Sequence, residues 1–189
     1  MDAAEPVTLR DGTAVLVRPV GPRDKPLFLE AFERFSDESR YRRFLAPKKR
    51  LTPRELVTLT EVDHHEHEAL GALEPGSGRG VGVARYVRHA PGAEGAEVAV
   101  AIVDAWQGRG LGWALLCRLA RRAAAEGIAS FTASLFTSNA AMLALLERLG
   151  TVEVLDRDAG VLVVDVALPV RDDCLHEVLR AAATGEVGM

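Results

Sequence analysis

The stretch EVAVAIVDAWQGRGLG, residues 97–112, decides how this chain is interpreted. Its first part, Glu97–Val103, is apolar after the glutamate and consists of small or β-branched residues, which predicts a strand covered on both faces. Its last part, Gln107–Gly112, contains three glycines. A helical apolar stripe then follows. The stripe comprises Leu111, Leu115, Leu119 and Ala123.

The glycine-rich segment Gln107–Gly112 therefore joins the end of a buried strand to the start of a helix. Glycine leaves backbone N–H groups uncovered and permits turns that other residues resist. A helix N-terminus adds unpaired donors and roughly half a positive charge. The segment is thus predicted to bind a pyrophosphate, with Arg109 adding a cation. The alternative is an ordinary strand-to-helix loop, which glycines alone do not exclude.

Two other phosphate-binding motifs fit this segment poorly. No Gly-Lys-Ser/Thr follows the glycines, as a Walker loop would require, and their spacing is not G-x-G-x-x-G. The segment instead resembles the signature Gln/Arg-x-x-Gly-x-Gly/Ala of the GNAT family of acetyltransferases, through Gln107, Gly110 and Gly112.

The resemblance extends over most of the chain, from about Leu9 to Leu168. Downstream, a run that begins at Asn139 is similar to the family's second cofactor motif. Upstream, several short segments look like the bacterial protein-lysine acetyltransferase branch. The residues that carry these matches are Asn139, Met142, Leu145 and Gly150 downstream, and Leu9–Gly12, Arg18-Pro19, Ser39–Tyr41, Arg43-Phe44, Leu51 and Glu55-Leu56 upstream.

Hairpin signals at both ends of the chain and strand–helix–strand signals between them predict a mixed sheet with helices on its faces. With the resemblance, the expected fold is an α+β GNAT fold of three α/β/α layers, whose twisted central sheet has about six or seven strands. Residues 1–170 are expected to form one acetyltransferase domain. A C-terminal helix and a frayed tail are expected over residues 171–189.

The resemblance also implies where the cofactor, acetyl-CoA, would bind. Two neighbouring strands splay apart in this family, and the pantetheine arm would pair with the backbone of Ile102 and Val103 like a missing strand. The pyrophosphate would lie on the N–H groups of Gly108 to Gly112, and Asn139 would reach the pantetheine from the facing strand. The implied cofactor-binding residues are Ile102, Val103, Gln107, Gly108, Arg109, Gly110, Leu111, Gly112, Asn139 and Met142.

Two residues are expected to be catalytic. Glu97 matches the glutamate that related lysine acetyltransferases use as general base, and burial would raise its carboxyl pKa toward the useful range. The alternative is an edge residue that points into solvent. The backbone N–H of Val103 would stabilise the oxyanion. The tyrosine with which many members protonate the leaving thiolate is replaced by Leu146, so Ser138, water or no dedicated acid would serve.

The predicted function is transfer of an acetyl or short acyl group from acetyl-CoA to a primary amine, most readily a protein lysine. A small-molecule amine acetyltransferase and a catalytically silent acyl-CoA sensor remain the alternatives. The net charge of −4 argues against a nucleic-acid partner. The longest apolar run, Val98–Val103, is too short to cross a membrane.

The remaining expectations concern location, metals and assembly. Met1–Pro6 lacks the features of a signal peptide, and Cys117 and Cys174 are most simply free thiols, so a cytoplasmic protein is expected. His64, His65 and His67 lack a second ligand cluster, so no metal site is expected, although a histidine here could line the substrate mouth. The chain is expected to be a monomer or a homodimer.

Overall fold

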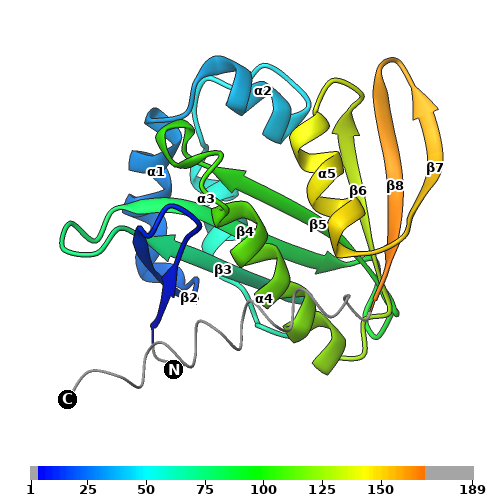
Figure 1. Cartoon of the computed structure of the whole chain (residues 1–189), viewed down its shortest axis with the longest axis horizontal. Helices are drawn as coiled ribbons and strands as arrows, with labels where there is room; N and C mark the ends of the chain where they lie inside the picture. The colour runs from blue at the N-terminus through cyan, green and yellow to red at the C-terminus, as the bar shows by residue number, and fades with distance from the viewer. Residues whose placement is uncertain (1–3, 169–189) are drawn as a thin grey trace.

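One mixed sheet runs through residues 4–168, the part of the chain that this computed structural model describes (Figure 1). Its eight strands follow the order β1-β2-β3-β4-β5-β6-β8-β7. The sheet has eight strands instead of the expected six or seven because both terminal hairpins join it. The strands are β1 (Glu5–Thr8), β2 (Ala14–Pro19), β3 (His67–Leu73), β4 (Gly80–Arg88), β5 (Gly95–Ile102), β6 (Ser130–Phe136), β7 (Val152–Asp158) and β8 (Val161–Ala167).

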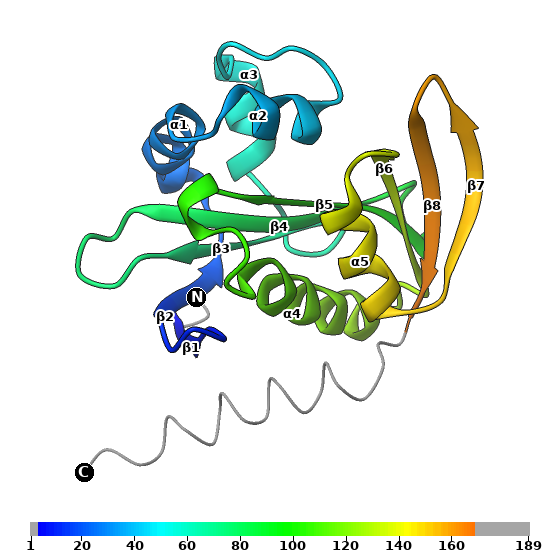
Figure 2. The ribbon, with the colours of Figure 1, turned by 45° about the horizontal axis from the view of Figure 1, so that its top comes forward.

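Helices cover both faces of this sheet, which confirms the predicted three α/β/α layers. Helices α1, α2 and α3 lie on one face, and α4 and α5 lie on the other (Figure 2). The expected helix over residues 171–189 lies outside the described residues. The α-helices are α1 (Lys25–Glu33), α2 (Asp37–Phe44), α3 (Pro53–Thr60), α4 (Leu111–Ala125) and α5 (Ala140–Leu149), with short 3₁₀ turns η1 (Pro22–Asp24) and η2 (Asp104–Trp106).

Local sequence signals account for the element ends that lie near the site. In the first hairpin, Gly12 adopts a φ of 81°, and the Thr13 N–H donates to Asp11 Oδ1 at 2.9 Å. At the start of α3, Thr52 and Glu55 form the predicted capping box, in which each side chain accepts from the other residue's backbone N–H. These contacts satisfy backbone donors that the turn and the helix leave unpaired.

The pairing between β5 and β6 sets the shape of the site. These are the only parallel neighbours in the described sheet, and they pair only at Gly95–Ser130, Ala96–Phe131 and Glu97–Thr132. Both strands continue beyond these pairs without pairing again. The described sheet therefore opens into a wedge whose closed end lies at Glu97 and Thr132.

Helix α4 forms the crossover between these two strands, and its apolar stripe packs into the main core. Leu115 and Leu119 have no exposed surface, and Leu111 is 1% exposed. Cys117 also lies on α4, and it is disulfide-bonded, so the expectation of a free thiol is wrong for this residue. Cys174 lies outside the described residues.

Gly150 links the end of α5 to the sheet. A Cβ atom there would lie 2.8 Å from the Ala167 carbonyl oxygen and 2.9 Å from Val166 Cγ1 on the β8 side. Gly150→Ala is therefore expected to lower the free energy of unfolding by about 1–3 kcal/mol, measured by urea denaturation. The control Gly21→Ala meets no heavy atom within 4 Å and should stay within about 0.5 kcal/mol of wild type. Equal stabilities of the two variants would contradict this packing.

Candidate active site

A cavity of about 580 Å³ occupies the wedge between β5 and β6. Its walls come from β5, β6, α2, α5 and the loop before α4, so it joins elements from both faces of the sheet. From Ile102 to Glu97 the cleft follows six strand residues, and the five steps between them span about 17 Å at roughly 3.3–3.4 Å per step. Its length and open edge suit an extended ligand. The lining residues discussed below are Arg10, Ser39, Arg42, Arg43, Glu97, Val98, Val100, Ile102, Gln107, Gly108, Gly110, Gly112, Ser134, Asn139, Met142 and Arg148.

The backbone of β5 presents unpaired polar groups to this cleft. The Val103 N–H donates to the Val81 carbonyl at 3.0 Å, so it points toward β4. Because backbone groups alternate in direction along an antiparallel pair, those of Val100 and Ile102 point to the other side, into the gap. The Ile102 carbonyl accepts from the Gln107 side chain there, so the groups left without a strand partner are the two N–H groups and the Val100 carbonyl. The expected role of Ile102 fits this geometry. The expected roles of Val103 in pairing with pantetheine and in binding the oxyanion are wrong, because its N–H is already used within the sheet.

The glycine loop has the backbone conformation that the sequence predicts. Gly108 and Gly110 adopt φ angles of 73° and 91°, which residues with a side chain rarely adopt. Gly110 is the N-cap of α4, so the first N–H groups of the helix lie next to it without intrahelical acceptors. Gly112 has a different role, since a Cβ atom there would lie 3.1 Å from Leu145 Cδ1. The absence of a Cβ atom at Gly112 allows α5 to approach α4.

Few side chains of the glycine loop contribute to the cleft. Arg109 does not line the cleft: its guanidinium lies 4.9 Å from the centre of the Trp106 ring, and its Nε lies 3.7 Å from Asp11 Oδ2. Arg109 thus points away from the cleft in this structure, and its role as a cation at the phosphate site stays a prediction. Leu111 is buried in the core, so only its backbone is available. Gln107 Nε2 donates to the Ile102 carbonyl at 3.0 Å.

The cations that do line the cleft come from elsewhere in the chain. They are Arg10, Arg42, Arg43 and Arg148. The Arg10 N–H donates to the Arg109 carbonyl at 3.2 Å, so the first hairpin docks on the glycine loop. Arg148 lies 3.9 Å from the centre of the Trp113 ring. Sequence reasoning missed both residues, although Arg148 follows Met142 and Leu145 at helical spacing.

Asn139 and Met142 both line the cleft, as the second motif predicts. Asn139 caps α5, and its Oδ1 accepts from the Met142 N–H at 3.2 Å. Leu146, at the position of the family's tyrosine, is fully buried in the core. Ser138 is not in the cleft wall. The hydroxyl groups of the described residues that line it belong to Ser39 and Ser134.

Asp104 fastens α2 to the segment that leads into the glycine loop. Its Oδ1 accepts from Ser36 Oγ at 2.6 Å and from Ser39 Oγ at 3.0 Å. Desolvation acts to raise the pKa of Asp104, but the hydrogen bonds from Ser36 and Ser39 outweigh it and lower this pKa below its usual value. Ser39 Oγ also accepts from Gln107 Nε2 at 3.2 Å. One network thus holds α2, β5 and the loop together.

Glu97 stands at the closed end of the wedge, but its side chain is exposed. The expectation that this carboxyl group is buried is therefore wrong. The electrostatic environment of Glu97 is set by two arginines. Desolvation lowers the pKa of Arg43 and of Arg85, and the negative charge of Glu97 acts in the opposite direction on both. Glu97 thus lies within electrostatic reach of two guanidinium groups.

Comparison with known proteins agrees with this geometry. A profile described as the acetyltransferase (GNAT) family matches residues 28–151. The chain belongs to the GNAT acetyltransferase family. Acetyltransferase Pat of Mycolicibacterium smegmatis is 38% identical over 164 residues, which cover 87% of this chain and 49% of that protein. Acetyltransferase PA5475 of Pseudomonas aeruginosa is 33% identical over 153 residues, which cover 80% of this chain and 82% of that protein.

Solved structures show the same likeness. The GNAT domain of S. lividans PAT aligns with a TM-score of 0.80 and 32% identity, covering 87% of this chain and 97% of that chain. A cAMP-binding acyltransferase from Mycobacterium smegmatis aligns with a TM-score of 0.64 and 31% identity. The alignment covers 96% of this chain and 56% of the acyltransferase chain. The chain thus spans about half the length of its two mycobacterial relatives.

Two further properties concern membranes and metals. Within residues 4–168, no helix has the length and apolar composition needed to cross a bilayer. Nor do three or more His, Cys, Asp or Glu side chains of that range form a group that could hold a metal ion.

The glycine loop can be tested by changing its N-cap. In Gly110→Asp, a carboxylate would stand where a pyrophosphate is expected, and a side chain would meet Arg10 Cγ at 3.4 Å. Acetyl-CoA affinity is expected to fall at least tenfold, or about 1.4 kcal/mol, measured by isothermal titration calorimetry.

Gly127→Asp supplies a matched control at the other end of α4. Gly127 also has a positive φ, of 79°, and no heavy atom lies within 4 Å of an added Cβ atom. It adds the same charge and a similar backbone strain away from the cleft. Unchanged acetyl-CoA binding in a folded Gly110→Asp protein would exclude the loop as the phosphate site.

Proposed function

We propose that this protein transfers an acetyl or another short acyl group from acyl-CoA to a primary amine, with a protein lysine as the preferred acceptor. The observation that carries this proposal is the wedge between β5 and β6, with unpaired backbone groups along one side, a helix N-terminus at its mouth and Glu97 at its closed end. A linear thioester with a phosphate-bearing head fits that order of groups.

The residues present suit acyl-CoA. The backbone of Val100 and the N–H of Ile102 would pair with the amide groups of the pantetheine arm, as a strand would. The N–H groups from Gly108 to Gly112 would hold the pyrophosphate, and Arg10, which lines the cleft beside this loop, is the cation proposed for the remaining phosphate charge. The acyl-CoA supplies an activated thioester carbonyl. This chain binds it, orients it and handles the proton of the acceptor.

Glu97 is the group proposed to take that proton. The amine nitrogen attacks the thioester carbonyl, a C–N bond forms, and the C–S bond breaks to release the thiolate. The nitrogen must lose a proton during this sequence, and the Glu97 carboxylate accepts it, directly or through a water molecule. The gap-facing N–H groups of β5 are the proposed oxyanion donors. Of Val100 and Ile102, Val100 lies nearer to Glu97 along the strand.

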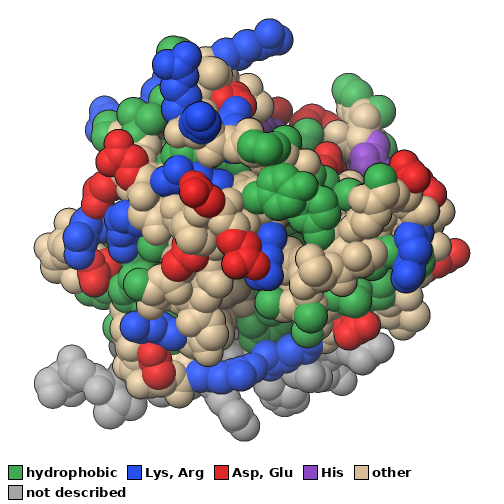
Figure 3. Space-filling model, turned by 90° about the horizontal axis from the view of Figure 1, so that it is seen from above, with side chains coloured by type: hydrophobic (Ala, Val, Ile, Leu, Met, Phe, Trp, Pro, Cys, Tyr) green, Lys and Arg blue, Asp and Glu red, His purple; other side chains and the backbone are tan. Residues whose placement is uncertain are grey.

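The residues of α2 favour a protein as the acceptor. The segment Ser39–Phe44, which resembles the protein-lysine acetyltransferase branch, forms most of α2 and lines the cleft. Tyr41 is exposed and stacks on Phe136 of β6 at 4.7 Å, so α2 bridges the two sides of the wedge. Seen from the side of α2, hydrophobic side chains gather near the middle of the surface, with charged groups around them (Figure 3). A folded protein segment could dock there.

A catalytically silent acyl-CoA sensor is the second candidate, and one observation favours it. The position of the family's leaving-group acid is Leu146, which is fully buried and has no proton to donate. A sensor would bind acetyl-CoA tightly and show no turnover with any amine. The proposed setting for either function is one domain over residues 1–170 of a cytoplasmic monomer or homodimer.

Replacement of Glu97 by glutamine tests the enzyme. An alkyl ammonium has a pKa near 10.4, so nearly all of it is unreactive at pH 7. Glu97→Gln keeps the shape and removes the proton acceptor, so turnover at pH 7 should fall by about 10²–10⁴-fold with near-normal acetyl-CoA binding. The rate should recover partly as the pH approaches the pKa of the amine, because the free amine no longer needs a base.

The control is Glu153→Gln, which removes an exposed carboxylate of β7 outside the cleft. This variant should behave like wild type at every pH. If Glu97→Gln also turns over like wild type at pH 7, Glu97 is not the base, whereas a loss that is constant with pH would indicate a damaged site.

A further inference from the structure

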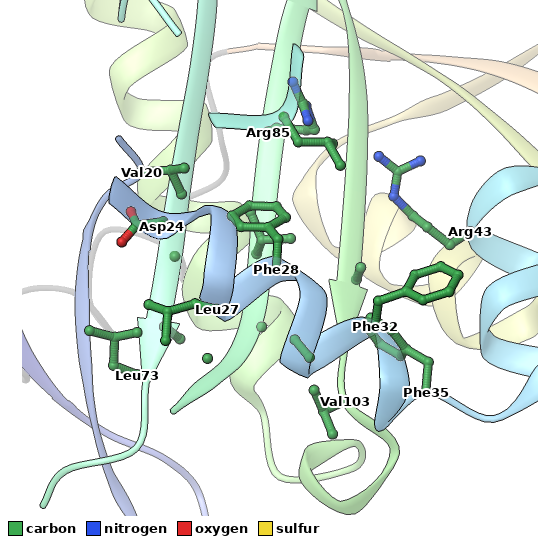
Figure 4. A pocket seen from close by; sticks show the side chains of 18 of the residues that line it. Val20, Asp24, Leu27, Phe28, Phe32, Phe35, Arg43, Leu73, Arg85 and Val103 are labelled. Atoms are coloured by element: carbon green, nitrogen blue, oxygen red, sulfur yellow. The ribbon is translucent and has the colours of Figure 1, made fainter. Parts of the chain in front are cut away.

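A second cavity lies under α1, next to the acyl-CoA cleft. It has a volume of about 80 Å³, and its walls are mainly apolar, with Phe28, Phe32 and Phe35 contributed by α1 and the turn that follows it (Figure 4). The two cavities share part of their walls. The residues that line both are Phe35, Arg43, Phe44 and Ala101. The second cavity is therefore a side pocket of the cleft, on the face of the sheet covered by α1 and α2.

Two guanidinium groups occupy one end of this side pocket. Arg43 extends from α2 and Arg85 from β4, and Figure 4 shows both at the same end. Arg85 is held in place because its Nη2 donates to the Thr58 carbonyl at 2.9 Å and contacts His67 Nε2. Desolvation and the charge of Arg85 lower the pKa of His67 to about 4, so this imidazole is neutral at pH 7 and adds no charge.

The charges at this end of the pocket do not cancel. Glu97 is the carboxylate that acts on both Arg43 and Arg85, so two cations face one anion. Within the described part of the chain, neither guanidinium forms an ion pair with a carboxylate. Asp24 also lines the pocket, but it is paired with Arg18 at 2.6 Å. Since charges in apolar surroundings are stable only when paired, one counter-ion position remains open.

We propose that Arg43 and Arg85 form a carboxylate-binding subsite at the inner end of the cleft. The carboxylate would be carried either by the acyl group, as in a dicarboxylic acyl-CoA, or by the acceptor beside its amine. The proposal rests on the function proposed above and adds a substrate class to it. Arg43 is the selective residue, because its side chain lines both the cleft and the pocket.

A carboxylate suits this subsite better than a phosphate. It is planar and carries one negative charge, which balances the single net positive charge of Arg43, Arg85 and Glu97 together. A guanidinium presents a planar fork of donors that matches a carboxylate. A phosphate is larger and doubly charged, and Glu97 would repel the extra charge. The small volume beside the guanidinium groups also favours the smaller anion.

The test measures preference in two arms. The acyl arm compares succinyl-CoA with butyryl-CoA, in which a methyl group replaces the carboxylate, using one neutral lysine peptide. The acceptor arm compares a peptide with glutamate after its lysine and the same peptide with glutamine there, using acetyl-CoA. Each arm gives the ratio of kcat/KM for the substrate with the carboxylate to kcat/KM for the substrate without it. A change that affects both substrates equally therefore cancels.

Wild type is expected to favour the carboxylate partner by about tenfold or more in at least one arm, as a charge-assisted hydrogen bond allows. Arg43→Gln should bring that ratio close to one, and Arg43→Lys should keep part of it, because it retains the charge without the fork. The control Arg54→Gln removes an exposed arginine of α3 and should keep the wild-type ratio. Melting temperatures establish that each variant is folded.

The subsite is excluded if wild type shows no preference in either arm, or if a preference survives in Arg43→Gln. Should wild type acylate no amine at all, the proposed function fails. The subsite is then decided by calorimetric titration of wild type and Arg43→Gln with succinyl-CoA and butyryl-CoA, and with both peptides in the presence of CoA. Weaker binding of the carboxylate partner alone in Arg43→Gln supports the subsite, and equal losses exclude it.

Discussion

The loss of pairing between β5 and β6 beyond Glu97 and Thr132 is the constraint on which the rest of the structure depends. Three residue pairs hold the strands together, and then both strands continue apart. Backbone groups that a neighbouring strand would satisfy are left facing a cavity of about 580 Å³. Buried polar backbone groups require partners. A ligand with its own peptide-like groups can provide them, and this requirement connects the fold of the GNAT family to acyl-CoA.

The elements around the wedge are tied to it rather than placed independently. Asp104 accepts from Ser36 and Ser39 at the start of α2, and Gln107 connects Ser39 to the end of β5. The wall that carries Arg43 is thus fixed to the loop expected to hold the pyrophosphate.

Local features of the fold could be predicted from the sequence. Glycine spacing predicted the loop before α4, where Gly108 and Gly110 have positive φ, and Thr52 with Glu55 predicted the start of α3. Properties that depend on tertiary structure were missed or wrong. The direction of the Val103 N–H follows from the register with β4, and Arg109 turns to Trp106 because the first hairpin docks beside it. No local pattern in the chain reports that Arg10 reaches the cleft or that Glu97 is exposed.

The central claim is that acyl-CoA completes the open edge of β5, and residue-resolved amide hydrogen exchange tests it most directly. Saturating acetyl-CoA should slow exchange at Val100 and Ile102, whose N–H groups face the gap. It should leave Val103 unchanged, because that N–H already donates to Val81. Exchange at Val100 and Ile102 that stays the same while acetyl-CoA is bound would contradict the account.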